Sequence, residues 1–450
     1  MGKYFGTDGI RGRFGDFPMT EAFAYHLSLA LAKFLRANSD QSHEQLAPII
    51  IGRDTRTSGT VLERVMQKGF KASGLSVIFL GVVPTPAVAL GVLKYKACLG
   101  IALTASHNPA SDNGIKLFNH KGEKFSLSVE ESIEDLVDSI EADYQAEELP
   151  EPEHIDHGYY AEAFSGLLKE SALSGMKIVL DCANGATFKT SPEILKAYGA
   201  DLVLLGVDPN GSNINEGVGS ECPNSLSSAV LQAGADLGLA HDGDGDRLVV
   251  CDEKGAIVPG DVLLGIYALD ALKYSALGSD TLVVTVQSNL GLDFAVKEAG
   301  GQVERVDVGD RNVAEKMRVI GSNLGGESSG HILFSDMCPT GDGLLAALQL
   351  LRIVQSENKP LSELSFGIEL FPQETKNLKV VEKIPLEQLS GLQSVLIEAE
   401  ALLSGEGRIL LRYSGTEPKL RILVEAKTSE MAKKVMQIVV TEACNGLRVL

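Results

Sequence analysis

The chain has 450 residues, of which 44% are apolar and 22% are charged, a composition typical of soluble globular proteins. It is too long for one hydrophobic core, so we expect three or four domains. The formal net charge of −20 argues against a nucleic-acid partner, whose phosphates would be repelled. The net charge does not exclude a phosphorylated small molecule as substrate. Salt screens the distant negative charges over about 8 Å, so cations near the site outweigh them.

The sequence also bears on location. No apolar run approaches the roughly 20 residues that span a bilayer, so we expect no membrane partner. The stretch Met1–Gly6 has neither the apolar region of a signal peptide nor the Ser or Thr at position 6 of a myristoylation signal. The six cysteines form no Cys-x-x-Cys pair, which indicates free thiols in a reducing compartment. We therefore predict a cytoplasmic protein.

In the first third of the chain, short apolar runs alternate with helical patterns. The predicted elements are a strand at 47–52, a helix at 59–73, a strand at 76–81, a helix at 84–97 and a strand ending at Ser106. Such βαβ units usually form parallel strands with ligands at their carboxyl ends. Ser128 and Glu131 fit a capping box that begins another helix. Glu147–Glu153 has two prolines and four glutamates and marks a boundary.

Two further α/β units and a different tail follow. The second unit has a strand at 178–180 and two strands, 237–240 and 248–251, that flank an Asp-rich loop; the third has a helix at 260–276 and a strand at 281–286. Three similar beginnings hint at an internal structural repeat. The tail indicates a smaller α+β domain with a helix, two strands and a helix at 385–403, 408–413, 420–426 and 430–444.

Ser106 ends the apolar run Gly100–Ser106 and is followed by His107. A hydroxyl at the mouth of a buried strand, held by a turn, is placed as a nucleophile would be. An ordinary turn serine is the competing interpretation. The nucleophile gains support from a second motif, because a serine that faces a carboxylate-bound cation suggests phosphoryl chemistry.

That motif places Asp242, Asp244 and Asp246 at alternate positions, with glycines between them. Two carboxylates 4 Å apart repel by about 4 kcal/mol at an effective dielectric near 20, so three converging carboxylates need a cation. Oxygen ligands favour Mg²⁺ or Ca²⁺, and an open position for a substrate oxygen suits Mg²⁺ in phosphoryl transfer. An exposed acidic turn is the alternative. An EF-hand is rejected, because Arg247 stands where that loop needs Gly and 248–251 reads as a strand.

Two more loops carry candidate binding residues. The segment 412–421 predicts a strand, a Gly-containing turn and a strand, which suits a phosphate dianion; a turn with solvated charges is the alternative. Its candidate ligands are Arg412, Ser414, Gly415, Thr416 and Arg421. Gly325–His331 combines a Gly-rich backbone with Glu and Ser side chains that suit sugar hydroxyls, although a plain hairpin tip would look the same. Arg11 and Lys116 each place a cation near turn glycines.

Together these motifs resemble the α-D-phosphohexomutase family. The resemblance runs in order along the whole chain, through Phe5–Gly12, Gly52–Arg56, Gly81–Pro86, Thr104–Pro109, Asp112–Lys116, Asp181–Gly185, Asn213–Asn215, Asp242–Arg247, Ser288–Gly291, Val308–Arg311, Gly325–His331, Thr340–Gly343 and Ser414–Pro418. Ser414-Gly415-Thr416, the N-terminal Gly-Thr-Asp-Gly-Ile-Arg and Thr340–Gly343 are typical of the branch that acts on glucosamine phosphates.

The resemblance implies three related α/β domains with mixed sheets and a smaller, mobile α+β domain around a central cleft. The implied domains are 1–152 with a phosphoserine loop, 153–255 with a metal loop, 256–368 with a sugar loop and 369–450 with a phosphate loop. The implied reaction converts glucosamine 6-phosphate to glucosamine 1-phosphate. It would proceed through phosphorylated Ser106 and a glucosamine 1,6-bisphosphate, and would feed UDP-N-acetylglucosamine and cell-wall precursor synthesis.

The resemblance also implies roles for individual residues. One Mg²⁺ per active site would be held by Asp242, Asp244, Asp246 and the phosphorylated Ser106, with a sugar 1,6-bisphosphate as activator and intermediate. Loops entering the cleft would bring Arg11, Lys116 and Arg247 to the phosphoryl oxygens, with Lys116 or His107 moving the hydroxyl proton. Glu327, Ser329 and His331 would bind the sugar, and the 412–421 loop the phosphate that is not reacting.

Other functions stay open at this point. Within the family, a phosphoglucomutase/phosphomannomutase is the alternative. Two alternatives lie outside the family. One is a metal-dependent phosphatase, although no second metal motif is visible in the sequence. The other is a catalytically silent sugar-phosphate sensor, and the intact Ser106 argues against it. The expected partner is a small sugar phosphate, and the sequence leaves open whether the chain forms a homodimer.

Overall fold

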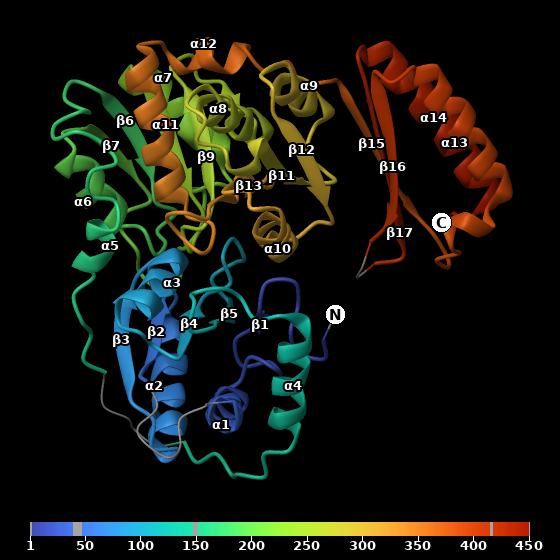
Figure 1. The fold of residues 1–450 in the computed structure, drawn as a ribbon. Coiled ribbons are helices and arrows are strands. Elements are labelled where there is room, and N and C mark those ends of the chain that lie inside the picture. The colour runs from blue at the N-terminus through green and yellow to red at the C-terminus, as the bar shows by residue number, and fades with distance from the viewer. Residues whose placement is uncertain (1, 39–46, 147–151, 415–416, 450) are drawn as a thin grey trace. The chain divides into compact units, whose positions relative to one another are not determined.

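The computed structural model describes residues 2–38, 47–146, 152–414 and 417–449 (Figure 1). The chain divides into two compact units. The larger unit comprises Met1–Gln287 and Gly300–Phe366, and the smaller unit comprises Ser288–Ala299 and Gly367–Leu450. Within the described ranges, no helix is both long enough and apolar enough to cross a bilayer.

The larger unit begins with a five-stranded mixed sheet in the order β1-β5-β4-β2-β3. Its strands are β1 (Ile10–Arg13), β2 (Ile49–Arg53), β3 (Val77–Val82), β4 (Leu99–Leu103) and β5 (Asp112–Phe118). Its helices are α1 (Glu21–Ala37), α2 (Thr57–Ala72), α3 (Thr85–Lys94) and α4 (Leu127–Asp138). Strands β3, β2 and β4 run parallel to one another. Strand β5 pairs antiparallel with β4, and β1 pairs antiparallel with β5. The βαβ pattern of the sequence therefore folds as predicted.

Both faces of this sheet are covered by helices. Alternate residues such as Ile49, Ile51 and Ile101 share a core with the apolar stripes of α1, α2 and α4. On the other face α3 packs over Gly52 and Gly100, where an added Cβ would lie 2.5–2.7 Å from valine side chains of that helix or its N-terminal turn. Glycine is required here because it lets the helix backbone approach the sheet closely. This close packing fixes α3 against β2 and β4.

A second mixed sheet follows in the order β10-β9-β8-β6-β7. Its strands are β6 (Lys177–Asp181), β7 (Asp201–Leu205), β8 (Leu237–His241), β9 (Leu248–Asp252) and β10 (Ile257–Val258). The helices of this region are α5 (Gly158–Glu162), α6 (Thr190–Ala197) and α7 (Pro223–Ala233). The strand β9 occupies the positions where an EF-hand would need ligands, which agrees with the rejection of that motif.

A third sheet has the order β12-β11-β13-β14. Its strands are β11 (Thr281–Thr285), β12 (Gln302–Val306), β13 (Leu324–Gly326) and β14 (Ile332–Phe334). The larger unit's remaining helices are α8 (Gly260–Lys273), α10 (Asp310–Ile320), α11 (Gly343–Glu357) and α12 (Leu361–Phe366), with a 3₁₀ turn at Gly278–Asp280.

One topology is used three times in these sheets. In each, the first parallel strand (β2, β6 or β11) lies between the second (β3, β7 or β12) and the third (β4, β8 or β13), and an antiparallel strand (β5, β9 or β14) follows beside the third. The predicted internal repeat and the α/β fold class with mixed sheets are thus confirmed. The predicted boundaries between the four domains stay predictions.

The smaller unit contains α9 (Leu290–Glu298) and a three-stranded antiparallel sheet in the order β15-β17-β16. Its other elements are β15 (Gln373–Lys379), a 3₁₀ turn (Leu386–Gln388), α13 (Ser390–Leu403), β16 (Gly407–Tyr413), β17 (Lys419–Ala426) and α14 (Ser429–Gly446). Helices α13 and α14 lie side by side on one face of the sheet (Figure 1). Their apolar side chains and those of β17 form one core.

Some sequence-based elements differ from the structure. The helix α4 begins after Ser126, so Ser128 lies in its first turn and the predicted capping box is wrong. The first helix of the tail begins at Ser390 rather than 385, because a 3₁₀ turn precedes it. Strands β1, β5 and β15 were not predicted. Each carries several polar residues or glycines, and their pairing partners rather than their own patterns make them strands.

Candidate active site

Three loops of the larger unit occupy equivalent places in the repeated topology. Each follows the third parallel strand of its sheet and precedes the antiparallel strand beside it. Ser106 follows β4, the loop Asp242–Asp246 joins β8 to β9, and Glu327–His331 joins β13 to β14. Carboxyl ends of parallel strands are where such folds place their ligands. The repeat therefore presents a serine, a carboxylate loop and a Gly-rich loop at the same structural position.

Ser106 is buried and has a left-handed backbone, with φ of 52°. For a non-glycine residue this conformation costs on the order of 1–2 kcal/mol, so the surroundings must hold it. Its backbone N–H donates to Thr104 Oγ1 at 2.9 Å, and its hydroxyl donates to Asp242 Oδ2 at 2.5 Å. The ring of His107 lies beside the hydroxyl, with Nδ1 3.2 Å from Oγ. The hydroxyl is thus aimed into the acidic loop.

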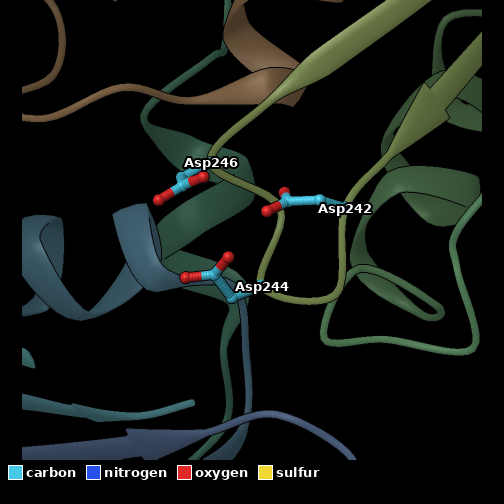
Figure 2. A group of neighbouring side chains, drawn as sticks. All are labelled: Asp242, Asp244 and Asp246. Atoms are coloured by element: carbon cyan, nitrogen blue, oxygen red, sulfur yellow. The ribbon is translucent and has the colours of Figure 1, made fainter. Parts of the chain in front are cut away.

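The side chains of Asp242, Asp244 and Asp246 gather around a common space (Figure 2). All three are buried, and each offers an oxygen within 4.8 Å of those of the other two. The loop can turn this tightly because Gly245 takes a φ of 74°. Thr85 fixes one carboxylate by donating from Oγ1 to Asp244 Oδ2 at 2.6 Å.

The donor set fits a hard divalent cation. Asp244 Oδ1 is buried and accepts no hydrogen bond, which marks an oxygen aimed at something else. Burial raises the pKa of Asp242 well above its usual value, and repulsion from Asp246 and Asp244 raises it further. A cation relieves that repulsion. Three carboxylate oxygens match the ligand preference of Mg²⁺ or Ca²⁺.

Lys116 lies against this cluster. Its Nζ is 2.7 Å from Asp244 Oδ2 and 2.9 Å from both Asp246 Oδ2 and Asp8 Oδ2. Burial lowers the pKa of Lys116, but the neighbouring carboxylates outweigh burial and hold the pKa well above its ordinary value. The side chain is therefore a permanent positive charge at the site in this arrangement, suited to stabilise anionic oxygen atoms.

The two other predicted cations also enter from defined places. Arg11 lies on β1 and donates to Asp8, whereas Lys116 lies on β5. The expectation that both residues lie on loops is wrong, because β1 and β5 pair with each other as strands. Arg247 does lie on a loop, and its Nε is 4.0 Å from Asp246 Oδ1.

Burial lowers the pKa of His107, and the charges of Arg247 and Arg11 lower it further.

The Gly-rich loop divides into an exposed and a buried part. Glu327–His331 is a hairpin tip between β13 and β14, with Glu327 N–H donating to His331 O at 2.9 Å. Ser329 is exposed, and Glu327 Oε1 accepts from Gly309 N–H at 3.0 Å. Ser329 and Glu327 thus stay on the surface of the tip, where a polar ligand has access.

His331 points the other way, into the acidic cluster. Its Nδ1 is 3.6 Å from Asp246 Oδ1 and its Nε2 is 3.4 Å from Asp310 Oδ2. Burial lowers the pKa of His331, but Asp246 and Asp310 raise it to about 9. Asp310 also pairs with Lys124 Nζ at 2.5 Å. Lys124, Asp310, His331 and Asp246 therefore form a continuous series of alternating charges that links the first, third and second α/β regions.

The candidate phosphate loop lies in the smaller unit, and Gly415 and Thr416 fall outside the described residues. Arg412 on β16 stands directly opposite Arg421 on β17 in the sheet register. Like charges in such a cross-strand pair destabilise a sheet, and an anion bound near both relieves that repulsion. Ser414 is buried, and its N–H donates to Lys419 O at 2.8 Å. Arg421 is exposed.

Several residues of the site carry no local pattern in the sequence that indicates their role. Asp8 and Asp310 lie in the segments 5–12 and 308–311 that resemble the family, but the sequence does not show that they contact Lys116 and His331. Arg56 and Asn215 lie in two other such segments, and they contact the backbone of the Ser106 loop. Lys124 had no signal at all, because a lysine after a turn looks like a solvated side chain.

Comparison with known proteins defines the class. Four segments match the phosphoglucomutase/phosphomannomutase family, with residues 2–144, 154–255 and 259–369 corresponding to its alpha/beta/alpha domains I, II and III and residues 376–442 to its C-terminal domain. A solved structure of a family protein from Burkholderia thailandensis has a TM-score of 0.80 at 24% identity and covers 100% of both chains. The chain belongs to the phosphoglucomutase/phosphomannomutase family.

Within that family the similarity is to phosphoglucosamine mutases. The phosphoglucosamine mutase of Solidesulfovibrio magneticus is 43% identical over 442 residues, covering 96% of each chain. A structure of Aspergillus fumigatus N-acetylphosphoglucosamine mutase, in complex with GlcNAc-6P and magnesium, has a TM-score of 0.66 at 18% identity and covers 99% of this chain and 96% of that one. The protein is accordingly a mutase, an isomerase that acts by phosphoryl transfer, which disfavours the phosphatase and sensor hypotheses.

Proposed function

We propose that the chain interconverts glucosamine 6-phosphate and glucosamine 1-phosphate, through a phosphorylated Ser106 and a glucosamine 1,6-bisphosphate. The observation that carries the proposal is the 2.5 Å contact between the Ser106 hydroxyl and Asp242 of the carboxylate loop. Its support in sequence is the 43% identity to a phosphoglucosamine mutase over nearly the full chain. The product would feed UDP-N-acetylglucosamine and cell-wall precursor synthesis.

Ser106 would act as a reusable carrier. Its Oγ gives its phosphoryl group to the free hydroxyl of the sugar monophosphate, the sugar's other phosphate returns to Oγ, and the number of phosphoryl groups is unchanged. A covalent carrier splits one difficult transfer into two easier ones. The proton of the sugar hydroxyl would be moved by His107 or Lys116, and the Nδ1 of His107 is 3.2 Å from Oγ of Ser106. Lys116, Arg11 and Arg247 would stabilise the phosphoryl oxygens.

Asp242, Asp244 and Asp246 would hold one Mg²⁺, with an oxygen of phosphorylated Ser106 as a further ligand. When bound, the ion neutralises negative charge on the transferring phosphoryl group. The unpartnered Asp244 Oδ1 supports this assignment. The protein's own contribution is to keep the three carboxylates at fixed positions, through Thr85 and the tight turn at Gly245.

Sugar and distal phosphate would be bound by the two other loops. Glu327 and Ser329 offer a carboxylate and an exposed hydroxyl to sugar hydroxyls. His331 would act mainly on Asp246, given its 3.6 Å approach. In the smaller unit, the facing Arg412 and Arg421, with Ser414, Gly415 and Thr416, would bind the phosphate that is not reacting. A sugar 1,6-bisphosphate would phosphorylate Ser106 in the resting enzyme.

The decisive experiment compares wild type with Ser106→Ala in Mg²⁺ buffer containing a trace of sugar 1,6-bisphosphate. We expect wild type to convert glucosamine 6-phosphate and to gain the mass of one phosphate at Ser106, and Ser106→Ala to do neither. Full activity of Ser106→Ala contradicts the carrier role. Ser111→Ala, which removes an exposed hydroxyl of the same loop, is the matched control.

Substrate choice needs its own measurement. A phosphoglucomutase/phosphomannomutase is the alternative within the family, so kcat/KM for glucosamine 6-phosphate is compared with those for glucose and mannose 6-phosphates. We expect the glucosamine substrate to have the highest value. A higher value for either other sugar contradicts the proposed specificity. We propose a cytoplasmic enzyme, because all six cysteines are free as in reducing compartments; a homodimer stays a hypothesis that sedimentation tests.

A further inference from the structure

Arg56 is a fully buried arginine with no role in the proposed function. Its side chain is 0% exposed, and it ion-pairs with Asp54, Nε to Oδ2, at 2.9 Å. Its other N–H groups reach the backbone of the Ser106 loop. Nη2 donates to Ser106 O at 3.0 Å and Asn108 O at 2.8 Å, and Nη1 donates to Asp112 O at 3.0 Å and to Pro109 O.

This set of contacts uses the whole guanidinium. An arginine side chain has five N–H donors in a fixed planar fork, and here one meets a carboxylate while four meet carbonyl oxygens of a single loop. A lysine has three donors around one atom and cannot reproduce that geometry. Arg56 therefore does more than balance the charge of Asp54: it fixes the course of the loop from residue 106 to residue 112.

Asn215 approaches the same carbonyl from the second α/β region. Its Nδ2 donates to Ser106 O at 2.9 Å and to Asn108 O at 3.2 Å. The backbone of Gly243, within the carboxylate loop, closes the third side, since a Cβ on Gly243 would lie 2.5 Å from Ser106 O. The Ser106 carbonyl thus accepts two hydrogen bonds and is packed against the loop that its own hydroxyl faces.

These contacts explain how a strained serine stays in place. Thr104 holds the N–H of Ser106, while Arg56 and Asn215 hold its carbonyl. With both neighbouring peptides fixed, the left-handed backbone is retained and only rotation about χ1 is left to direct Oγ. A misplacement of about 1 Å costs on the order of 100-fold in rate in reactions that depend on alignment.

We propose that Arg56 and Asn215 are positioning residues for phosphoryl transfer, because they lock the backbone of Ser106 in the left-handed conformation that aims its hydroxyl at Asp242. The inference rests on the proposed role of Ser106 as phosphoryl carrier. It adds that the aim of the carrier is set jointly by the first and second α/β regions. Neither residue contacts the reacting atoms.

The test uses the full-length enzyme, phosphorylated with a sugar 1,6-bisphosphate and quantified for phosphoserine by intact mass. The single-turnover rate of transfer to glucosamine 1-phosphate is measured for wild type and Arg56→Lys and expressed per phosphorylated chain. We expect Arg56→Lys to lower that rate on the order of 100-fold, with KM for the sugar phosphate changed less than about threefold. A merely structural role would lower the thermal midpoint and the phosphorylated fraction without changing the rate per phosphorylated chain.

Two further variants keep the result interpretable. Arg53→Lys is the matched control, because Arg53 lies three residues away and pairs with Glu63 rather than the serine loop; it should transfer at the wild-type rate. If Arg56→Lys fails to fold, Asn215→Asp tests the inference instead. Asp has the size of Asn and also tolerates a left-handed backbone, but it places carboxylate oxygens against the two carbonyls and so loses both hydrogen bonds. Asn213→Asp in the same segment is its control.

The outcomes separate the two proposals. A wild type that transfers no phosphoryl group from Ser106 overturns the proposed function, and this inference with it. If wild type transfers the phosphoryl group and both Arg56→Lys and Asn215→Asp do so at rates within about threefold of it, only the inference is overturned. A rate ratio that small is below the effect expected of lost alignment.

Discussion

The hydroxyl of Ser106 lies 2.5 Å from Oδ2 of Asp242, although 136 positions separate the two residues in the chain. Each stands at the carboxyl end of the third parallel strand of its own sheet, β4 or β8. Two copies of one topology thus face each other with different chemistry at equivalent points. A nucleophile is supplied by one copy and the carboxylates that accompany it by the next.

Asp244→Asn should remove metal-dependent activity more than substrate binding. The substitution keeps the size of the side chain and an acceptor for Thr85, but it removes one negative charge from the carboxylate cluster. We expect kcat to fall by roughly two to three orders of magnitude, Mg²⁺ binding measured by calorimetry to weaken, and KM to change little. Asp208→Ala, at an exposed position outside the cluster, should behave as wild type. A change confined to KM would show that the loop binds substrate instead.

Arg421→Ala should weaken binding of the distal phosphate. Arg421 faces Arg412 across β17 and β16, and loss of one charge-assisted hydrogen bond corresponds to a rise in KM of roughly tenfold. Inorganic phosphate should raise the Tm of wild type more than that of the variant, because phosphate relieves the repulsion of the pair. Lys427→Ala, which removes an exposed cation paired with Glu406, is the control. Unchanged kinetics and phosphate response would exclude Arg421 from the site.

The buried carboxyl of Asp342 predicts a pH dependence of stability, to which the negative charge of Asp246 contributes. Burial raises the pKa of this carboxyl from 3.8 to about 7, so the folded protein binds a proton more tightly than the unfolded chain. Its contribution is fully present below pH 3.8 and is lost as the pH rises through 7, which destabilises the fold by on the order of 4 kcal/mol across that window.

Asp342→Asn tests this. Asn keeps an oxygen to accept from the N–H of Leu344 at the start of α11 and from the hydroxyl of Tyr160, but it does not ionise. Urea midpoints of the two proteins between pH 4.5 and 8 should converge at low pH, with the variant more stable above pH 7. Parallel profiles would show that the carboxyl titrates at its ordinary pKa in the folded state.

Thiol reactivity should single out Cys444. It is exposed on α14, whereas Cys182, Cys251 and Cys338 are buried. Burial raises the pKa of Cys251 to about 11 and that of Cys182 to about 12, so little of either is thiolate at pH 8. Brief iodoacetamide treatment of the folded enzyme should label Cys444 first, by peptide mass, and Cys444→Ser should lose that label. Rapid labelling of Cys182 would contradict its buried position.

The local patterns of the sequence were informative where chemistry depends on neighbours in the chain. The apolar run before Ser106, the alternate spacing of Asp242, Asp244 and Asp246, and the βαβ order were all visible, because each is set by a few consecutive residues. The strands β1 and β5 were not, since polar residues and glycines hide their pattern. The capping box at Ser128 was wrong because the same residue types also occur inside a first turn.

Ser106 and the acidic loop show what sequence determines here and what it leaves open. The order of residue types sets the kind of chemistry available: a hydroxyl at a strand end, hard oxygen ligands and arginines on either side of a turn. Only the tertiary structure brings Lys116 and His331 to the same carboxylate, that of Asp246, and Arg56 and Asn215 to one carbonyl. Those contacts join segments that are distant in the chain, so they depend on how the sheets are built and packed against each other. The left-handed backbone of Ser106 is likewise held by such contacts, since its own residue type does not favour it.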